Sequence, residues 1–260
     1  MSSNSSPTAA CKLCNTVATL IWSHVIPRWT YRRVDKMGTP GSPNAPVQVF
    51  DDVAMLKVDQ DAEYMLCEAC ERIIKVGEDY AADVSLQVDG SFPARNACVV
   101  ERHDGEDCIA DASALDIDKL AHFAAGVVWR ASVSTTLKHY DDIDLGKYNV
   151  QFAQYLSGKA GFPANARLMI ELLDPKIGPR IHGVVIKPEV QKFGGYRVFH
   201  FCVFGIMFRI QLGNALPKST IVSSILDNKK IYISDGSRVL GAVAKRAHAV
   251  TPKGSLARKL

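Results

Sequence analysis

Four cysteines in two pairs are the residues of this sequence whose types and spacing indicate a definite chemistry. Cys11 and Cys14 form one C-x-x-C pair, Cys67 and Cys70 form a second, and 52 residues separate the two pairs. Two residues between paired cysteines let both sulfurs reach one ion, and structural zinc takes four tetrahedral ligands. We therefore expect one structural Zn²⁺ held by four thiolates, with no open position for water. The alternative is four ordinary buried thiols.

The whole cysteine set agrees better with metal binding than with a disulfide framework. The chain has seven cysteines, an odd number, and its Ser-rich start at Met1–Ala10 has the composition of a disordered leader and not of a signal peptide. The longest apolar stretch, Val198–Ile210, contains His200 and Arg209 and is shorter than the roughly 20 apolar residues of a membrane span. We predict a cytoplasmic protein with no membrane partner.

A histidine and three arginines lie between the cysteine pairs. His24 stands in the segment Ser-His-Val-Ile-Pro, and Arg28, Arg32 and Arg33 follow it closely. Histidine supplies a base near neutral pH, and arginines after it could contact a nucleic-acid backbone. The alternative for His24 is a buried, hydrogen-bonded structural residue.

Two glutamates follow the second cysteine pair. Glu71 and Glu78 are seven residues apart, which places them on one face of a helix, two turns from each other. Both carboxylates are candidate site residues. The alternative is a solvated face with a Glu71–Lys75 contact at i,i+4 spacing.

The elements that must position these residues begin with two extended segments and a helix. We expect a strand over 16–22, a Gly- and Pro-rich loop over 38–46 and a second extended segment over 47–50. From Cys67 to about Tyr80 the residues favour a helix.

A second unit begins near Ala112. Apolar residues at helical spacing predict a helix to about Ser132, capped by Asp116 and apolar on both sides, so we expect it to be buried. A second helix, about 145–156, ends before Gly158, in the position of a C-terminal cap.

The pattern then changes to strands. Alternating residues over 167–172, an apolar run over 181–186 and two further runs over 197–204 and 208–212 predict an antiparallel sheet covered by the two helices.

The order of these motifs resembles the HNH endonucleases over about residues 11–80. The resemblance implies a zinc-braced ββα-metal, or treble-clef, unit in which His24 is the catalytic base and one Mg²⁺ or Mn²⁺ assists. Pro27 matches the proline of the family's first motif. This chain has Ser23 where the family usually has an acidic ligand, and Glu71 where the helix usually has asparagine or histidine.

The resemblance therefore gives a specific set of expected roles. Glu71 is the expected second catalytic residue, Glu78 the expected residue for the catalytic cofactor, and Arg28, Arg32 and Arg33 the expected nucleic-acid contacts.

These expectations combine into an α+β fold in two parts. A disordered leader covers residues 1–10, a zinc-binding HNH-like module 11–95, an α+β domain with two helices on a mostly antiparallel sheet 112–248, and a basic tail 249–260. The charge is patterned as well, because the middle of the chain is acidic and both ends are basic. Such patterning could steer a polyanion toward particular faces.

The predicted function is metal-dependent hydrolysis of DNA, and RNA is the second choice of substrate. Such a nuclease could serve in defence against foreign DNA. The first alternative is a zinc-braced nucleic-acid-binding module without catalysis. The second is a zinc-stabilised interaction protein, with a protein partner bound through the C-terminal domain.

Overall fold

A computed structural model describes residues 6–37, 48–49, 54–55, 60–104, 107–135, 137, 142–173, 184–218 and 224–236. These residues form a mixed α+β structure, which confirms the predicted class at that level. The helices are α1 (Arg28–Met37), α2 (Glu68–Val84), α3 (Pro93–Ala97), α4 (Ile117–Val133), the 3₁₀ turn η2 (Gly146–Tyr148), α5 (Asn149–Leu156) and α7 (Ile225–Asn228). The strands are β1 (Thr8–Ala10), β2 (Val17–His24), β3 (Gln48–Val49), β4 (Ala54–Met55), β5 (Ala62–Cys67), β6 (Val99–Asp104), β7 (Asp107–Asp111), β8 (Ala166–Leu173), β9 (Val185–Phe193), β10 (Tyr196–Val203), β11 (Ile206–Gly213) and β12 (Lys230–Ser234).

The described strands form a large sheet and two small ones. The large sheet has the order β6-β7-β12-β8-β11-β10-β9, and its strands pair antiparallel except for β12 with β8. The small sheet that carries the cysteine motifs has the order β1-β2-β5 and is antiparallel. Strands β3 and β4 form a separate antiparallel pair.

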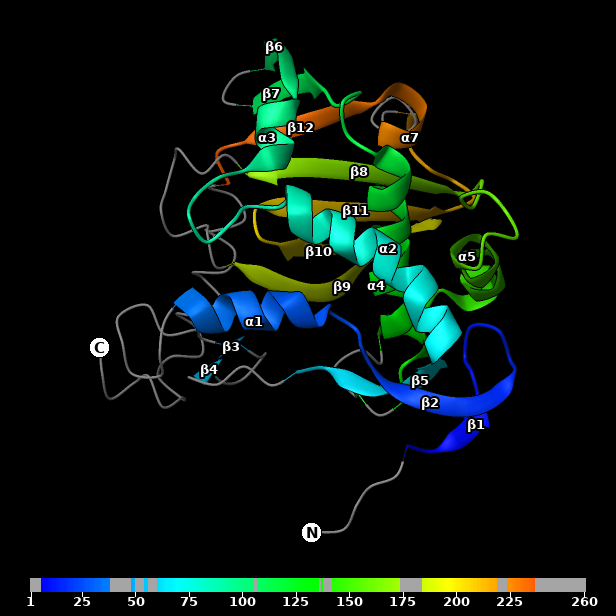
Figure 1. Ribbon diagram of the computed structural model, residues 1–260. Helices are drawn as coiled ribbons and strands as arrows, with labels where there is room; N and C mark the ends of the chain where they lie inside the picture. The colour runs from blue at the N-terminus through cyan, green and yellow to red at the C-terminus, as the bar shows by residue number, and fades with distance from the viewer. Residues whose placement is uncertain are drawn as a thin grey trace.

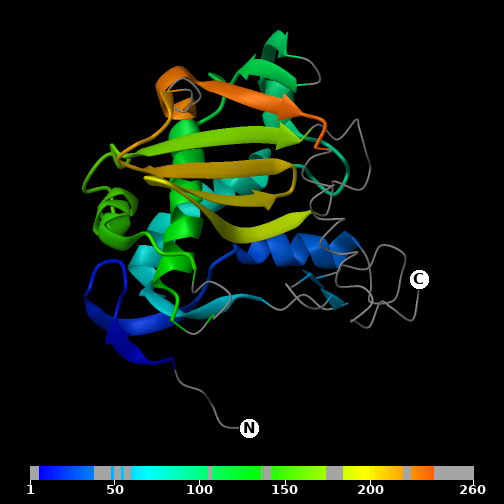
Figure 2. The same cartoon turned by 180° about the vertical axis from the view of Figure 1, so that it is seen from behind.

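The helices lie mostly on one side of the large sheet. In Figure 1, α4 crosses the strands with α2 in front of it, and α5 lies beside them. Figure 2, from behind, shows the strands in front of these helices. Helix α1 runs along the β9 edge, and the β1-β2-β5 sheet lies below it. The segments from both predicted units thus lie against each other.

The contact between α2 and α4 is unusually close at one glycine. A Cβ atom added at Gly77 would lie 2.8 Å from the backbone nitrogen of Phe123 and 3.0 Å from the carbonyl oxygen of Lys119. Only glycine lets the two backbones approach in this way. The same hydrophobic core includes Ile74 of α2, Phe123 of α4 and Phe208 of β11. The boundary between the units 11–95 and 112–248 stays a prediction, since their residues share one core.

Most predicted elements are present in the described chain. The capped helix is α4, where the Asp116 side chain accepts a hydrogen bond from the Lys119 backbone N–H at 3.1 Å. The second helix appears as η2 and α5, and Gly158 follows it with φ of +71°. Helix α2 continues to Val84, beyond the predicted end, because its buried face includes Ala81 and Val84.

The structure differs from the predictions in several places. Thr8–Ala10, part of the predicted disordered leader, pairs with β2 as β1, because β2 offers it a free edge. Helix α1 and strands β6, β7 and β12 were not expected. The loop 38–46, the tail 249–260 and residues 181–183 of the predicted run 181–186 lie outside the described residues, as does most of the segment 47–50.

Candidate functional site

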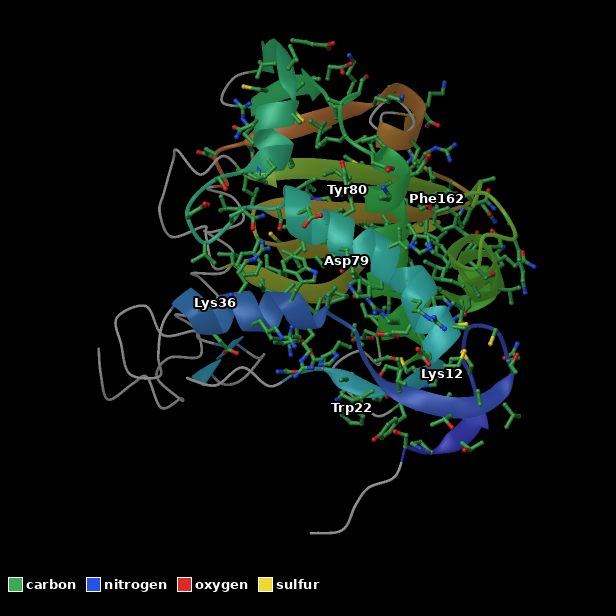
Figure 3. All side chains as sticks on the ribbon, in the orientation of Figure 1. Lys12, Trp22, Lys36, Asp79, Tyr80 and Phe162 are labelled. Atoms are coloured by element: carbon green, nitrogen blue, oxygen red, sulfur yellow. The ribbon has the colours of Figure 1, made fainter. Side chains whose placement is uncertain are left out.

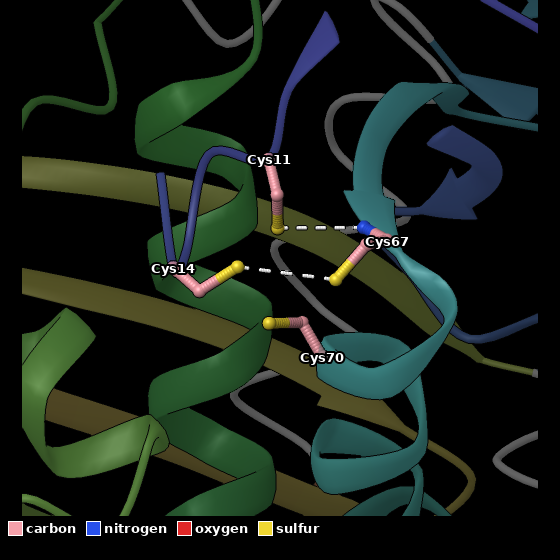
Figure 4. A group of neighbouring side chains, drawn as sticks. All are labelled: Cys11, Cys14, Cys67 and Cys70. Carbon is pink, nitrogen blue, oxygen red and sulfur yellow. Dashed lines mark hydrogen bonds between the residues drawn. The ribbon is translucent and has the colours of Figure 1, made fainter. Parts of the chain in front are cut away.

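The four cysteines of the two motifs meet at one point. Their sulfur atoms all lie within 4.8 Å of one another, and Cys14 Sγ is 3.9 Å from Cys67 Sγ. Figure 4 shows the four side chains converging from two separate segments. Zinc–sulfur bonds of about 2.3 Å in a tetrahedron place sulfurs about 3.8 Å apart. The cluster therefore has the dimensions to hold a metal ion such as zinc.

Local backbone geometry presents each pair. The first pair sits on a tight turn, in which the Asn15 N–H donates to the Cys11 carbonyl at 2.8 Å and Asn15 has φ of +60°. Cys67 ends β5 and is the N-cap of α2, so Cys70 lies in the first helical turn. The Cys67 N–H also donates to Cys11 Sγ at 3.3 Å. A turn presents the first pair and a strand-to-helix junction presents the second, and the Cys67–Cys11 contact joins the two.

Electrostatics differ within the cluster. Hydrogen bonds from the side chain and backbone of Thr16 lower the pKa of Cys14 to about 6. Burial, followed by hydrogen bonds to the neighbouring thiols, raises the pKa of Cys70. Metals bind thiolates, so the more acidic Cys14 favours capture of an ion, and the bound cation would then favour deprotonation of the rest.

Ser23 contacts Glu71 directly. Ser23 is buried at the end of β2, and its Oγ donates to Glu71 Oε2 at 3.0 Å. The next residue, His24, is half-buried, and its Nε2 lies 2.8 Å from Gln60 Oε1. Thus β2 and the first turn of α2 bring Ser23 and Glu71 into contact, while the His24 side chain contacts Gln60.

Glu78 has a different partner. Its Oε1 lies 2.5 Å from Nη2 of Arg130 on α4, whose side chain is only 1% exposed. A buried charge of this kind requires a partner, because the interior does not solvate it. Ser23, His24, Glu71, Glu78 and Arg130 are called the polar cluster below.

The polar cluster shifts the pKa of its members. Burial raises the pKa of the Glu71 carboxyl, and the Arg130 charge partly opposes this. Burial lowers the pKa of His24 below 6.5; the Gln60 contact opposes the shift, and the charges of Arg130 and Arg28 add to it. At neutral pH, His24 is therefore a neutral imidazole that can accept a proton.

The three arginines of the predicted nucleic-acid contact are not equivalent. Arg28 and Arg32 are exposed on α1. Arg33 instead donates to Ser85 Oγ at 2.7 Å and to the carbonyl oxygens of Leu86 and Ala82 at 2.9 and 3.1 Å. Its guanidinium is occupied in holding the end of α2, so the geometry favours Arg28 and Arg32 as external contacts.

Hydrogen bonds around one ion pair, and a second ion pair, join the region of the β1-β2-β5 sheet to the rest of the chain. Lys12, inside the first cysteine motif, donates to Glu63 Oε1 at 2.5 Å and to the Val133 carbonyl at 2.6 Å. Glu63 also accepts from Ser134 Oγ at 3.0 Å. We call these contacts the Lys12–Glu63 clamp. A second pair joins Asp61 to Lys187 of β9 at 2.7 Å.

Three residues of this region were missed from the sequence: Arg130, Gln60 and Lys12. Arg130 carries a usable signal, since a charge inside a helix that is apolar on both sides needs a buried partner. Gln60 and Lys12 stand in segments without a diagnostic pattern, so only the folded chain identifies them.

No family model, curated protein or solved structure matches this chain. Within the described residues no helix is both long and apolar enough to cross a membrane. The cysteine cluster and the polar cluster are therefore the features from which a function can be inferred.

Proposed function

We propose that this chain is a metal-dependent endonuclease of the HNH type, in which β2, β5 and α2 form a ββα unit braced by zinc. The observation that carries the proposal is the 3.0 Å hydrogen bond between Ser23 and Glu71. It joins the residue before His24 to the acid that follows the second cysteine pair. In the HNH family the first of these positions usually holds an acidic ligand of the catalytic cation, and we propose that Glu71 replaces it here.

The chemistry of the polar cluster supports this proposal. With its Nε2 proton donated to Gln60, His24 keeps an unprotonated Nδ1 to take a proton from water. The water oxygen then bonds to phosphorus while the P–O bond to the leaving sugar oxygen breaks, and that oxygen takes a proton from solvent. Neutral His24 is available at physiological pH because burial lowers its pKa.

The expected catalytic cation is Mg²⁺ or Mn²⁺, held by Glu71. When bound, it would stabilise negative charge on the phosphate oxygens. Mg²⁺ usually keeps several waters and takes one or two carboxylates together with substrate phosphate, so one protein carboxylate is a sufficient donor set. Glu78, paired with Arg130, is the weaker candidate for a ligand.

The proposed substrate is DNA, with RNA as the less favoured polymer. Exposed Arg28 and Arg32 directly follow the Ser-His-Val-Ile-Pro segment and could contact backbone phosphates. The proposed location is the cytoplasm, because thiols that bind metal persist in a reducing compartment. The seven-stranded sheet would then select the target or bind a protein partner.

The main alternative is a nucleic-acid-binding module that keeps the zinc fold without catalysis. Ser23 favours it, because a hydroxyl is a weaker cation ligand than a carboxylate. The Glu78–Arg130 pair favours it too, since it removes a second carboxylate.

A plasmid-nicking assay with Mg²⁺ or Mn²⁺ tests the endonuclease proposal. The wild type should nick, and His24→Ala should reduce the rate by about 10²- to 10⁴-fold, the usual contribution of a general base. His200→Ala, on β10 of the large sheet, is the matched control and should keep the rate. Absence of metal-dependent nicking by the wild type, or undiminished nicking by His24→Ala, rejects the catalytic assignment.

A further inference from the structure

Helix α1 carries a row of positive charge that starts beside His24. Arg28, Arg32 and Lys36 are exposed and four residues apart. Residues at this spacing lie on one side of a helix, about 6 Å apart along its axis. Lys36 lies at the end of α1 away from the β1-β2-β5 sheet, as Figure 3 shows. The row therefore extends about 12 Å along the helix axis from Arg28.

An open groove runs beside this row. It encloses about 480 Å³ between α1 and the turn that follows α2, and its lining residues are Trp29, Arg32, Arg33, Lys36, Gln87, Val88 and Asp89. Three of the lining side chains are cationic and one is anionic. The anionic one, Asp89, accepts hydrogen bonds from the Ser91 N–H at 2.9 Å and the Ser91 hydroxyl at 2.7 Å. The groove is thus net positive.

The inner wall of the groove is fixed by contacts of Arg33. Its guanidinium carbon lies 4.6 Å from the Trp29 ring centre and 4.9 Å from that of Phe204, in addition to the three hydrogen bonds described above. Phe204, at the tip of the β10–β11 hairpin, has φ of +42°, which bulky residues rarely adopt. Trp29 Nε1 is buried and has no hydrogen-bond partner among the described residues. The cationic wall of the groove is therefore held in place by contacts with the rest of the fold.

We propose that the α1 row and this groove bind the phosphate backbone of the nucleic acid on one side of the cleaved bond, an inference that rests on the proposed endonuclease function. Arg28, Arg32 and Lys36 contact successive parts of one strand. Arg33 adds positive charge from the wall.

Charge and spacing select a nucleic acid as the occupant. Cations near the start of a helix oppose its macrodipole, and α1 has no acidic residue in its first turn, so a bound polyanion would relieve an existing repulsion. Each strand of DNA carries one charge per 3.4 Å of axis, so steps of about 6 Å reach about every second phosphate. The row is also continuous with His24, which an isolated anion site would not require.

A charge reversal on the exposed residues tests the groove without disturbing the core. Arg32→Glu combined with Lys36→Glu should weaken binding of a labelled DNA duplex at least tenfold in fluorescence anisotropy. Because each lost phosphate contact lowers the salt slope of log K by about 0.9, the slope should fall by about two. Lys159→Glu, exposed after α5 on another side of the molecule, is the matched control and should change neither.

Three ligands distinguish the sources of the phosphate chemistry. A DNA duplex and an RNA duplex of equal length should both show the loss, with inorganic phosphate as a weak competitor only. Equal affinity of the double variant and the wild type for both duplexes overturns the proposal. Tight competition by inorganic phosphate also overturns it, in favour of a small-anion site.

Nicking kinetics separate this inference from the endonuclease proposal. The double variant should raise KM and keep kcat, because its charges lie away from His24. If the wild type nicks and the double variant binds and nicks unchanged, the groove proposal fails alone. If binding shows the predicted loss and the wild type does not nick, the endonuclease proposal fails alone. A wild type that neither binds nor nicks overturns both.

Discussion

The cysteine cluster and the polar cluster both include residues at the start of α2, yet they are built in different ways. The four thiols come from two short motifs whose backbone turns present them, and a single ion would satisfy all of them. The polar cluster takes its members from β2, α2 and α4, and Glu78 depends on Arg130 from a segment outside the motif region. The candidate metal centre thus uses two short motifs, whereas the polar cluster depends on how α2 packs against α4.

The largest expected effect comes from removing the cysteine cluster while leaving the polar cluster unchanged. Cys67→Ser combined with Cys70→Ser should abolish metal binding and lower the melting temperature by roughly 10 °C or more, because binding energy at a structural metal site is folding energy. Elemental analysis and thermal unfolding measure these changes. Cys108→Ser, outside the cluster, should retain one ion per chain. A double variant that keeps stoichiometric metal would contradict the four-thiolate centre.

The next effect acts on the polar cluster alone. Arg130→Met should cost about 3–5 kcal/mol of unfolding free energy, because the largely buried Glu78 side chain loses its cationic partner. Combining it with Glu78→Leu should recover most of the loss, since the pair is then replaced by apolar side chains. Urea denaturation gives both values. A loss below about 1 kcal/mol for the single variant would show that the pair is dispensable.

A smaller effect concerns the seam that brings Arg130 to Glu78. Gly77→Ala should cost about 1–3 kcal/mol, because its methyl group would press on the α4 backbone, while metal content stays at one ion per chain. Gly126→Ala is the control in the same seam. Its Cβ would meet the Ile74 side chain at an ordinary 3.5 Å, so stability should hold or rise. If both variants lost the same unfolding free energy, the close approach of the two backbones at Gly77 would not be what makes alanine unfavourable there.

The smallest effect is a shift in the pH dependence of nicking. His24 must be neutral to accept a proton, so the rate should rise with pH through the pKa of His24 and level off above it. Because burial lowers that pKa, the midpoint should lie below pH 6.5. The Gln60 contact raises the pKa, so Gln60→Met should move the midpoint lower still. Initial rates between about pH 5 and 8 measure it, and a midpoint above 6.5 would remove His24 from the role of base.

Local patterns allowed much of the fold to be predicted. The helix capped at Asp116 and the alternating strand around Ile170 follow directly from periodicity, and both are present as α4 and β8. Helix α1 was missed because Arg28–Met37 is rich in charged residues, so its short buried face did not stand out in the sequence. Its stability comes from packing of Tyr31 and Val34 in the core.

The candidate site was predictable to the same degree. Spacing alone located the four cysteines and indicated that Glu71 and Glu78 share a helix face. It could not indicate that Glu71 would bond Ser23 while Glu78 would bond Arg130, because those contacts depend on how α2 packs against β2 and α4.

The Lys12–Glu63 clamp has a consequence for how the protein is made. Lys12 needs the carbonyl of Val133, and Glu63 needs Ser134, so neither side chain finds its full set of partners on a nascent chain that ends near residue 95. At about 5–20 residues per second, the ribosome adds the missing stretch within several seconds. During that interval Lys12 and Glu63 would lack their partners at Val133 and Ser134. If a metal ion bound to the four cysteines before α4 was made, the N-terminal segment would fold without its contacts to α4.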